Sequence, residues 1–197
     1  MRRQLLVLRH GRSVANEQGR IASSLANAEH DFGLTEEGRA EVGASLGEAA
    51  PPVRSPVVVV SSPLLRARET AEIAAEAFGT DVRVDHRLIE RGFGELELAS
   101  DDRYESVWAL DRRDPTHRTW AVESVVDVWA RLRELVEDLR QEPGPRADGA
   151  SSILLVPHGD VASTLVCASK GEPLSRHREV GALGTGELRV VDWPTVG

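Results

Sequence analysis

Two histidines, His10 and His158, each follow an apolar run and precede a glycine. The runs are Leu5–Leu8 and Ile153–Val156, and short aliphatic runs of this kind are typical of parallel strands buried on both faces. The residues just beyond the carboxyl ends of such strands lie at the edge where open α/β sheets bind ligands. Arg9 directly precedes the first histidine. The pattern therefore predicts a site of imidazoles and a guanidinium, which suits an anionic substrate.

These residue types fit phosphoryl transfer in particular. A neutral imidazole is a nucleophile near pH 7, since its reference pKa is about 6.5. A guanidinium matches two phosphate oxygens at once and stays charged at any physiological pH. Phosphoryl transfer asks the protein mainly to position the reactants and to stabilise charge on the equatorial oxygens.

Composition narrows the class of protein further. The chain has 197 residues, which suits one substantial core, and we expect a single domain over residues 1–197. Its formal net charge of −8 argues against nucleic acid as a partner, and no apolar stretch approaches the roughly 20 residues that span a bilayer. Cys167 is the only cysteine and we read no signal peptide, so we expect a cytoplasmic protein without structural zinc. Oligomeric state is left open.

Apolar runs alternate with helical patterns along the chain. This alternation predicts βαβ units in a three-layer α/β/α sandwich with a mostly parallel central sheet. Ser62-Pro63 is expected to cap the helix that follows the second strand. The expected strands are 4–8, 57–61, 82–84, 153–156 and 187–192, and the expected helices are 35–50, 62–78, 124–141 and 161–169, with 141–151 as a surface loop.

Two stretches, 23–31 and 95–119, lack a clean period. Loops near an active-site edge often select the substrate, so both are candidates for excursions over that edge. The second is expected to contribute a helix around 104–110.

Four ordered motifs resemble those of the histidine phosphatase superfamily, the phosphoglycerate-mutase-like enzymes. Residues 9–16 fit R-H-G-x-[ST]-x-x-N, and residues 61–70 resemble S-S-P-L-x-R-A-x-x-T. Residues 88–94 resemble L-x-E-x-x-F/Y-G, and residues 156–160 (Val-Pro-His-Gly-Asp) resemble the S-H-G-G segment. The resemblance covers nearly the whole chain.

The resemblance implies a metal-independent phosphatase, without a cofactor, that hydrolyses a small-molecule phosphate monoester through a phosphohistidine on His10. Arg9 and Arg66 would bind the phosphoryl group, and His158 would be a protonated donor to it. Glu90 would protonate the leaving group and then activate water, with Glu95 as an alternative proton donor. The predicted substrate-binding residues are Ser13, Asn16 and Gly159, which lie in these motifs, and Ser23, which lies where the family often has glycine.

Several points stay open at the level of sequence. The chain departs from the family pattern at three places that border the substrate. Val122 stands before Glu123-Ser124, where the family commonly has glycine, and Ala22-Ser23-Ser24 stands where it frequently has glycine. After the third motif the family often has W-E-G, whereas this chain reads Glu95-Leu96-Glu97-Leu98. Roles for Arg12, Arg68 and Arg91 are not assigned, and the substrate is not named. The alternatives are a cofactor-dependent phosphoglycerate mutase, which Glu90-Arg91-Gly92-Phe93-Gly94 resembles slightly, and a non-catalytic phospholigand-binding scaffold.

Overall fold

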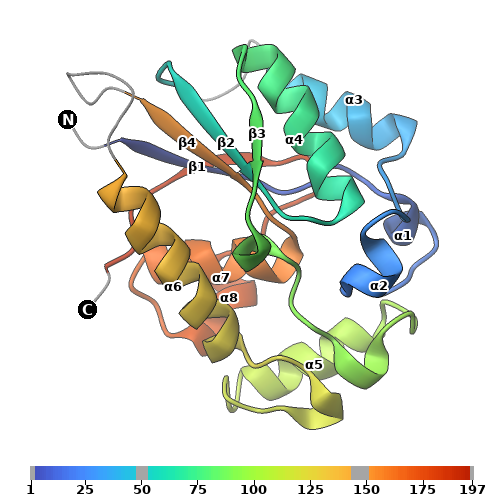
Figure 1. Ribbon diagram of the computed structural model, residues 1–197. Helices are drawn as coiled ribbons and strands as arrows, with labels where there is room; N and C mark the ends of the chain where they lie inside the picture. Colours follow the sequence, from blue (N-terminus) through green and yellow to red (C-terminus); the bar gives the residue numbers. More distant parts are fainter. Residues whose placement is uncertain (1–2, 48–52, 143–150, 196–197) are drawn as a thin grey trace.

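The computed structural model describes residues 3–47, 53–142 and 151–195, and a five-stranded sheet forms its centre (Figure 1). The strand order is β3-β2-β4-β1-β5, in which β1 to β4 run parallel and β5 pairs antiparallel with β1. The predicted mostly parallel sheet is therefore confirmed. The strands are β1 (Gln4–Leu8), β2 (Val57–Ser61), β3 (Val82–Val84), β4 (Ser152–Val156) and β5 (Leu188–Val191).

Helices cover both faces of this sheet. On one face α3 (Glu36–Ser45) and α4 (Leu65–Phe78) pack on Leu6 and Leu8, and on the other α6 (Val125–Gln141) and α7 (Gly159–Ser169) pack on Leu5 and Val7. Successive strand residues point to opposite faces, and here both faces are apolar. This explains why the strands are continuous aliphatic runs rather than alternating ones, and it confirms the three-layer architecture.

Two helix boundaries differ from the sequence prediction. Helix α4 begins at Leu65 and has no side-chain cap, whereas the sequence predicted Ser62 as the cap. The Ser62 hydroxyl accepts the N–H of Leu64, the residue before the helix, at 3.3 Å. Helix α3 ends at Ser45 in a glycine-containing turn, whereas the sequence suggested residue 50; residues 48–50 and most of the predicted loop 141–151 lie outside the described residues. Helix α6 starts as expected, with Ser124 Oγ accepting the Asp127 N–H at 3.1 Å.

The segment 93–123, called the cap below, lies beyond the carboxyl ends of the strands (Figure 1). It has its own apolar cluster, in which Phe93, Leu96, Val107 and Val122 pack with Ile21. The expected helix near 104–110 is present as α5. The remaining short elements are α1 (Val14–Glu17), α2 (Leu25–Ala28), η1 (His86–Leu88), η2 (Gly94–Leu96), α5 (Arg103–Asp111), η3 (Thr119–Ala121), η4 (Leu174–Arg176) and α8 (His177–Val180).

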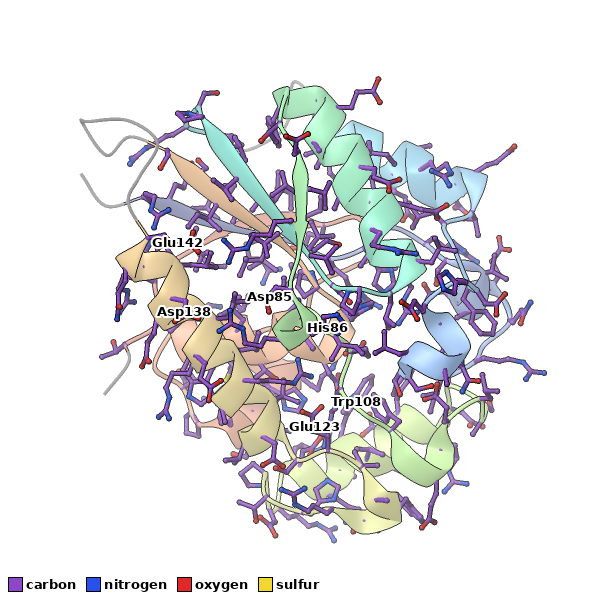
Figure 2. The ribbon with its side chains drawn as sticks, in the orientation of Figure 1. Asp85, His86, Trp108, Glu123, Asp138 and Glu142 are labelled. Carbon is purple, nitrogen blue, oxygen red and sulfur yellow. The ribbon has the colours of Figure 1, made fainter. Side chains whose placement is uncertain are left out.

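A partly exposed chain of ion pairs joins the segment that leads into the cap to the core. Arg87 of η1 pairs with Asp85 at 2.7 Å and with Asp138 of α6 at 2.6 Å; Figure 2 labels both carboxylates. The turn that carries Glu90 is therefore held against α6. Of the helices that the structure describes, none combines the length and the apolar character needed to cross a membrane.

Candidate active site

His10 lies just beyond the end of β1, next to the end of β4. Its backbone N–H donates to Pro157 O at 3.2 Å, so the two strand ends that carry the histidines are joined directly. The rings of His10 and His158 have centroids 5.0 Å apart. Gly11 allows this turn to pack closely, because a Cβ there would lie 2.4 Å from Gly38 O.

The hydrogen bonds of His10 define its tautomer. Nδ1 lies 2.8 Å from the carbonyl oxygen of Gly11, which can only accept, so Nδ1 carries the proton. Nε2 then presents a lone pair and accepts from Arg66 Nε at 3.1 Å. Burial, with Arg66 and Arg9 nearby, holds the pKa of His10 well below its usual value. The imidazole is therefore neutral and nucleophilic at Nε2.

Protein groups satisfy the buried Arg66 and the partly buried Arg9 only in part. Arg66 Nη2 donates to Ala22 O at 2.8 Å, and Arg9 Nη1 donates to Leu183 O at 2.7 Å. Arg66 Nη1 and Arg9 Nε are buried and have no hydrogen-bond partner among the described residues. Since unpartnered buried donors are costly, these two point to an anionic ligand.

His158 is fully buried behind His10 and does not line the cavity described below. Its Nε2 lies 2.7 Å from Ser62 Oγ, which already accepts the Leu64 N–H, so the Ser62 hydroxyl proton is free to donate to Nε2. In the tautomer in which Ser62 donates to Nε2, the imidazole proton is on Nδ1, which has no partner among the described residues. Burial and then Arg66 hold the pKa of His158 well below its usual value, so these surroundings favour a neutral donor rather than the protonated one expected from the sequence.

Glu90 supplies a carboxyl group to the same centre. Its side chain is 8% exposed, and its Oε1 accepts the Arg91 N–H at 2.9 Å. Burial raises the pKa of Glu90, and Asp160 raises it further, although the Arg91 N–H, Arg66 and Arg9 oppose them. The environment therefore favours a protonated carboxyl, the form that a general acid needs.

These groups surround a cavity of about 170 Å³, a volume that suits a small molecule. Four of the predicted catalytic residues, Arg9, His10, Arg66 and Glu90, line it. The remaining lining residues are Ser13, Ala15, Asn16, Arg20, Ala22, Asp101, Tyr104, Trp108, Gly159, Asp160 and Arg178.

The predicted substrate-binding residues divide into two groups. Ser13, Asn16 and Gly159 line the cavity, and Asn16 Oδ1 accepts from Ser13 Oγ at 2.8 Å, which leaves its amide nitrogen as the donor end. Ser23 does not line it; its backbone N–H and hydroxyl both bond to the carboxylate of Glu97. Ser23 therefore supports the wall behind Ala22, and its contact with substrate stays a prediction.

The structure also places the residues whose roles the sequence left open. Arg12 pairs with Glu37 at 3.6 Å, and Arg68 donates to Glu29 O at 2.9 Å; neither lines the cavity. Glu95 is exposed on η2, away from the lining residues, which favours Glu90 as the proton donor. Arg91 lies fully buried in an ion cluster next to the cavity.

Sequence reasoning missed the wall that the cap contributes. Tyr104 and Trp108 lie one turn apart on α5 with their rings stacked, centroids 5.4 Å apart, and Arg178 lies over the Trp108 ring at 4.1 Å (Figure 2 labels Trp108). The i, i+4 aromatic pair was the one available signal. Arg20, Asp101, Asp160 and Arg178 have no local pattern that would place them at the cavity.

No group of three or more His, Cys, Asp or Glu side chains in the described part of the chain is arranged to hold a metal ion. The cations that face an anionic ligand at this site are arginines. Metal-independent catalysis stays a prediction with a direct test below.

Comparisons with known proteins agree with this geometry. The sequence profile of the histidine phosphatase superfamily (branch 1) matches residues 5–196. A glucosyl-3-phosphoglycerate phosphatase of Mycobacterium tuberculosis is 33% identical over 195 residues, covering 92% of this chain and 82% of that protein. The structure of mycobacterial glucosyl-3-phosphoglycerate phosphatase with VO3 is similar, with a TM-score of 0.76 and 29% identity over 98% and 100% of the two chains. A phosphoglycerate mutase from Thermus thermophilus has a TM-score of 0.65 and 30% identity over 97% and 94%.

Proposed function

The chain belongs to the histidine phosphatase superfamily, and from that premise we propose that it hydrolyses a phosphate monoester through a phosphohistidine on His10. The predicted enzyme class, a phosphoric monoester hydrolase, agrees with its phosphatase relatives. All five predicted catalytic groups are present in one centre, which argues against a non-catalytic scaffold. A cytoplasmic location and a single domain over 1–197 are part of the same proposal.

One observation carries the proposal. Two buried nitrogens, Arg9 Nε and Arg66 Nη1, have no partner among the described residues and belong to side chains that line the cavity together with His10. Buried polar groups are almost always satisfied, so two such donors beside one nucleophile indicate a ligand site. A phosphoryl group offers equatorial oxygens that these guanidinium donors can bind.

In the first half-reaction, His10 Nε2 attacks phosphorus in line with the ester oxygen. Arg66 Nε releases the lone pair of Nε2 and joins the other donors on the phosphoryl oxygens. The P–O ester bond breaks as the N–P bond forms, and Glu90 gives its proton to the departing alkoxide. The products are an alcohol, phosphohistidine and an ionised Glu90.

In the second half-reaction, the ionised Glu90 takes a proton from water. The water oxygen attacks phosphorus, the N–P bond breaks, and inorganic phosphate leaves with His10 Nε2 restored. One carboxyl therefore serves first as acid and then as base. A raised pKa suits a carboxyl group to both roles, because it can then hold a proton and also take one up.

For the substrate we propose a small phosphorylated hydroxy acid or a derivative of one. Arg20 and Arg178 add two cations to the cavity lining besides the two at the phosphoryl centre. The phosphatase relatives act, by their names, on glucosyl-3-phosphoglycerate.

The test is a panel of phosphate monoesters that includes glucosyl-3-phosphoglycerate, 3-phosphoglycerate, sugar phosphates and nucleotides. We expect phosphate release to be fastest with phosphorylated acids and to vanish in the His10→Ala variant. Preference for neutral sugar phosphates would refute the proposed substrate class, and full activity of His10→Ala would refute the nucleophile.

The likeness to a phosphoglycerate mutase supports one second candidate, a cofactor-dependent mutase. A mutase must shield its phosphohistidine from water and return the phosphoryl group to a bound sugar acid. Incubation with 3-phosphoglycerate and catalytic 2,3-bisphosphoglycerate separates the two activities. We expect release of inorganic phosphate or no reaction; rapid exchange of the 2- and 3-isomers without phosphate release would establish the mutase.

A further inference from the structure

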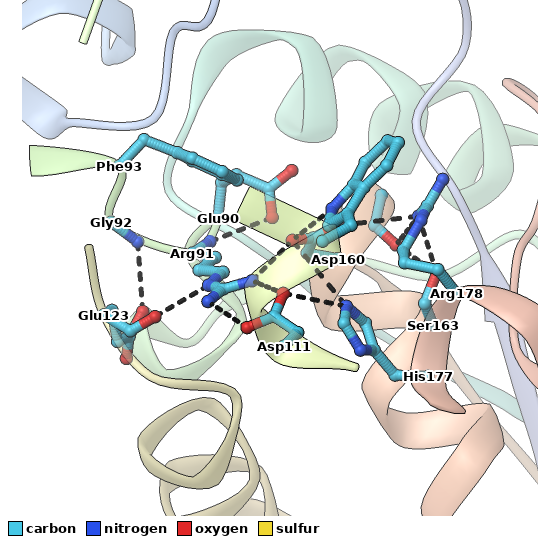
Figure 3. A network of polar contacts seen from close by, with 12 residues as sticks. Glu90, Arg91, Gly92, Phe93, Asp111, Glu123, Asp160, Ser163, His177 and Arg178 are labelled. Atoms are coloured by element: carbon cyan, nitrogen blue, oxygen red, sulfur yellow. Dashed lines mark hydrogen bonds and ion pairs between the residues drawn. The ribbon is translucent and has the colours of Figure 1, made fainter. Parts of the chain in front are cut away.

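Directly after Glu90, the side chain of Arg91 is fully buried in a cluster of charges (Figure 3). Its Nη1 and Nη2 donate to Asp111 of α5 at 2.7 and 2.8 Å, and Nη1 also lies 3.2 Å from Asp160 Oδ2. Its Nε donates to Glu123 O at 2.7 Å. Arg91 is therefore fixed from three sides, and its backbone N–H holds Glu90 Oε1.

Asp160 is the member of this cluster that also reaches the cavity. It is 4% exposed, is the second residue of α7 and lies two positions after His158, where the S-H-G-G pattern has glycine. Its carboxylate accepts from Trp108 Nε1 at 3.1 Å and from Arg178 Nη1 at 3.5 Å, so it joins α5, α7 and α8. Figure 3 shows the carboxyl groups of Glu90 and Asp160 on the same side of Arg91, and both line the cavity.

Four charged or titratable side chains face Glu90, each from a different part of the fold. Arg9 follows β1 and Arg66 belongs to α4, and both favour its ionised form; Tyr104 comes from α5 and Asp160 from α7. Burial alone would raise the pKa of Asp160, but His177, Arg178 and Arg91 hold it below its usual range. Asp160 is therefore the ionised carboxylate beside Glu90, and a like charge disfavours a second ionisation.

We propose that Asp160 is the positioning residue for proton transfer by Glu90. It anchors Arg91, whose backbone N–H orients Glu90, and its negative charge keeps the proton on Glu90 until the leaving oxygen takes it. After that transfer two carboxylates face each other, which makes Glu90 a stronger base toward the attacking water. This inference rests on the proposed function of Glu90 as acid and base.

The test compares two isosteric variants, Asp160→Asn and Asp111→Asn. Both carboxylates pair with Arg91, but Asp111 does not line the cavity. The readout is the pH profile of kcat/KM for an alkyl phosphate, which needs a proton on its leaving group, and for p-nitrophenyl phosphate, which does not.

For Asp160→Asn we expect the alkaline limb of the alkyl-phosphate profile to move to lower pH. The loss on that limb should be on the order of tenfold, less than the 10²–10⁴ of losing the acid altogether. The aryl profile should keep its shape. Asp111→Asn should leave both limbs where they are; because Asp111 shares the anchoring of Arg91, it should lower kcat/KM more for the alkyl phosphate than for the aryl phosphate. Asp160→Glu, which keeps the charge, should retain the wild-type limb.

Equal losses on the two substrates with no movement of the limb in Asp160→Asn would overturn the inference, and so would the same movement in Asp111→Asn. If Asp160→Asn does not fold, infrared difference spectra of the wild type test the inference by reporting whether Glu90 is protonated. A protonated-carboxyl band at neutral pH that Glu90→Gln removes supports the inference, and an ionised Glu90 at neutral pH refutes it. Absence of phosphatase activity in the wild type would instead refute the proposed function.

Discussion

The phosphoryl centre and the cap are held in place by different interactions. His10, Arg9 and His158 follow directly from β1 and β4, whose backbones pair in register and whose side chains fill the core on both faces. The cap has a small apolar cluster of its own and is joined to α7 and α8 through buried charges on Arg91, Asp111 and Asp160. The centre is therefore built directly on the sheet, whereas the cap is held by its own apolar cluster, by backbone hydrogen bonds to the segment around Ile21 and by long-range ion pairs.

This difference suggests a division of labour. In the proposed mechanism, the groups that bind and attack the phosphoryl group come from the strand ends and α4, and they do not depend on which alcohol is released. The cap and α8 supply Tyr104, Trp108 and Arg178 to the cavity lining, and the turn before the cap supplies Glu90, the proposed acid. Chemistry common to all phosphate esters and selection among them thus belong to separate regions.

Glu90→Gln is expected to have the largest selective effect. It should lower kcat/KM for alkyl phosphates by roughly 10²–10⁴, the usual contribution of general acid catalysis, and affect p-nitrophenyl phosphate much less. The matched control is Glu95→Gln, which changes an exposed carboxyl five residues away that does not line the cavity. Equal losses on both substrates would transfer the acid role to another group.

Arg66→Ala tests the centre itself. Removing one preorganised donor costs roughly 10²–10³ in turnover in comparable sites, and here we expect that loss on alkyl and aryl phosphates alike. Arg68→Ala is the control, because Arg68 lies on the same helix, bonds to Glu29 O and does not line the cavity. A loss confined to alkyl phosphates would contradict the division between the two regions.

The sequence predicted the residues of the centre, but for the cap it predicted only an excursion over the active-site edge with a helix near 104–110, and not which of its side chains line the cavity. The reason is physical. A buried strand ending in His-Gly is a local pattern, so His10 and His158 are visible in seven-residue windows. The partners of Arg91 lie 20 and 69 positions away, and no period or spacing links them. A local rule also failed where a side chain had a tertiary use: Ser62, which was expected to cap the helix, contacts His158 instead.

Arg91→Met addresses the stability of the cap. Removing one partner of a buried ion cluster leaves uncompensated charges on Asp111 and Asp160, so we expect a loss of about 3–5 kcal/mol in the free energy of unfolding. Urea titration followed by tryptophan fluorescence measures it. The control is Arg176→Met, which removes an arginine that also pairs with two carboxylates, Glu172 and Glu179, but at the surface. The unfolding midpoint of this variant should hardly differ from that of the wild type. Similar midpoints for both variants would refute the structural role of the cluster.

Chelation should have the smallest effect. Arginines and histidines already supply the positive charge and the donors at the centre, so activity should survive exhaustive treatment with EDTA. Vanadate should inhibit, because it can mimic five-coordinate phosphorus, and a phosphatase relative has been seen with VO3. Loss of activity that magnesium or zinc restored would contradict the metal-independent mechanism.

The most direct test of the account is to trap the covalent intermediate. Rapid quench with a phosphate-labelled substrate should give a phosphoenzyme that is labile in acid and stable in base, with the label on His10. His10→Ala should carry no label and show no turnover, while Glu90→Gln should still become labelled by an aryl phosphate. Turnover by the wild type without label on His10, or label on another residue, would contradict the central claim.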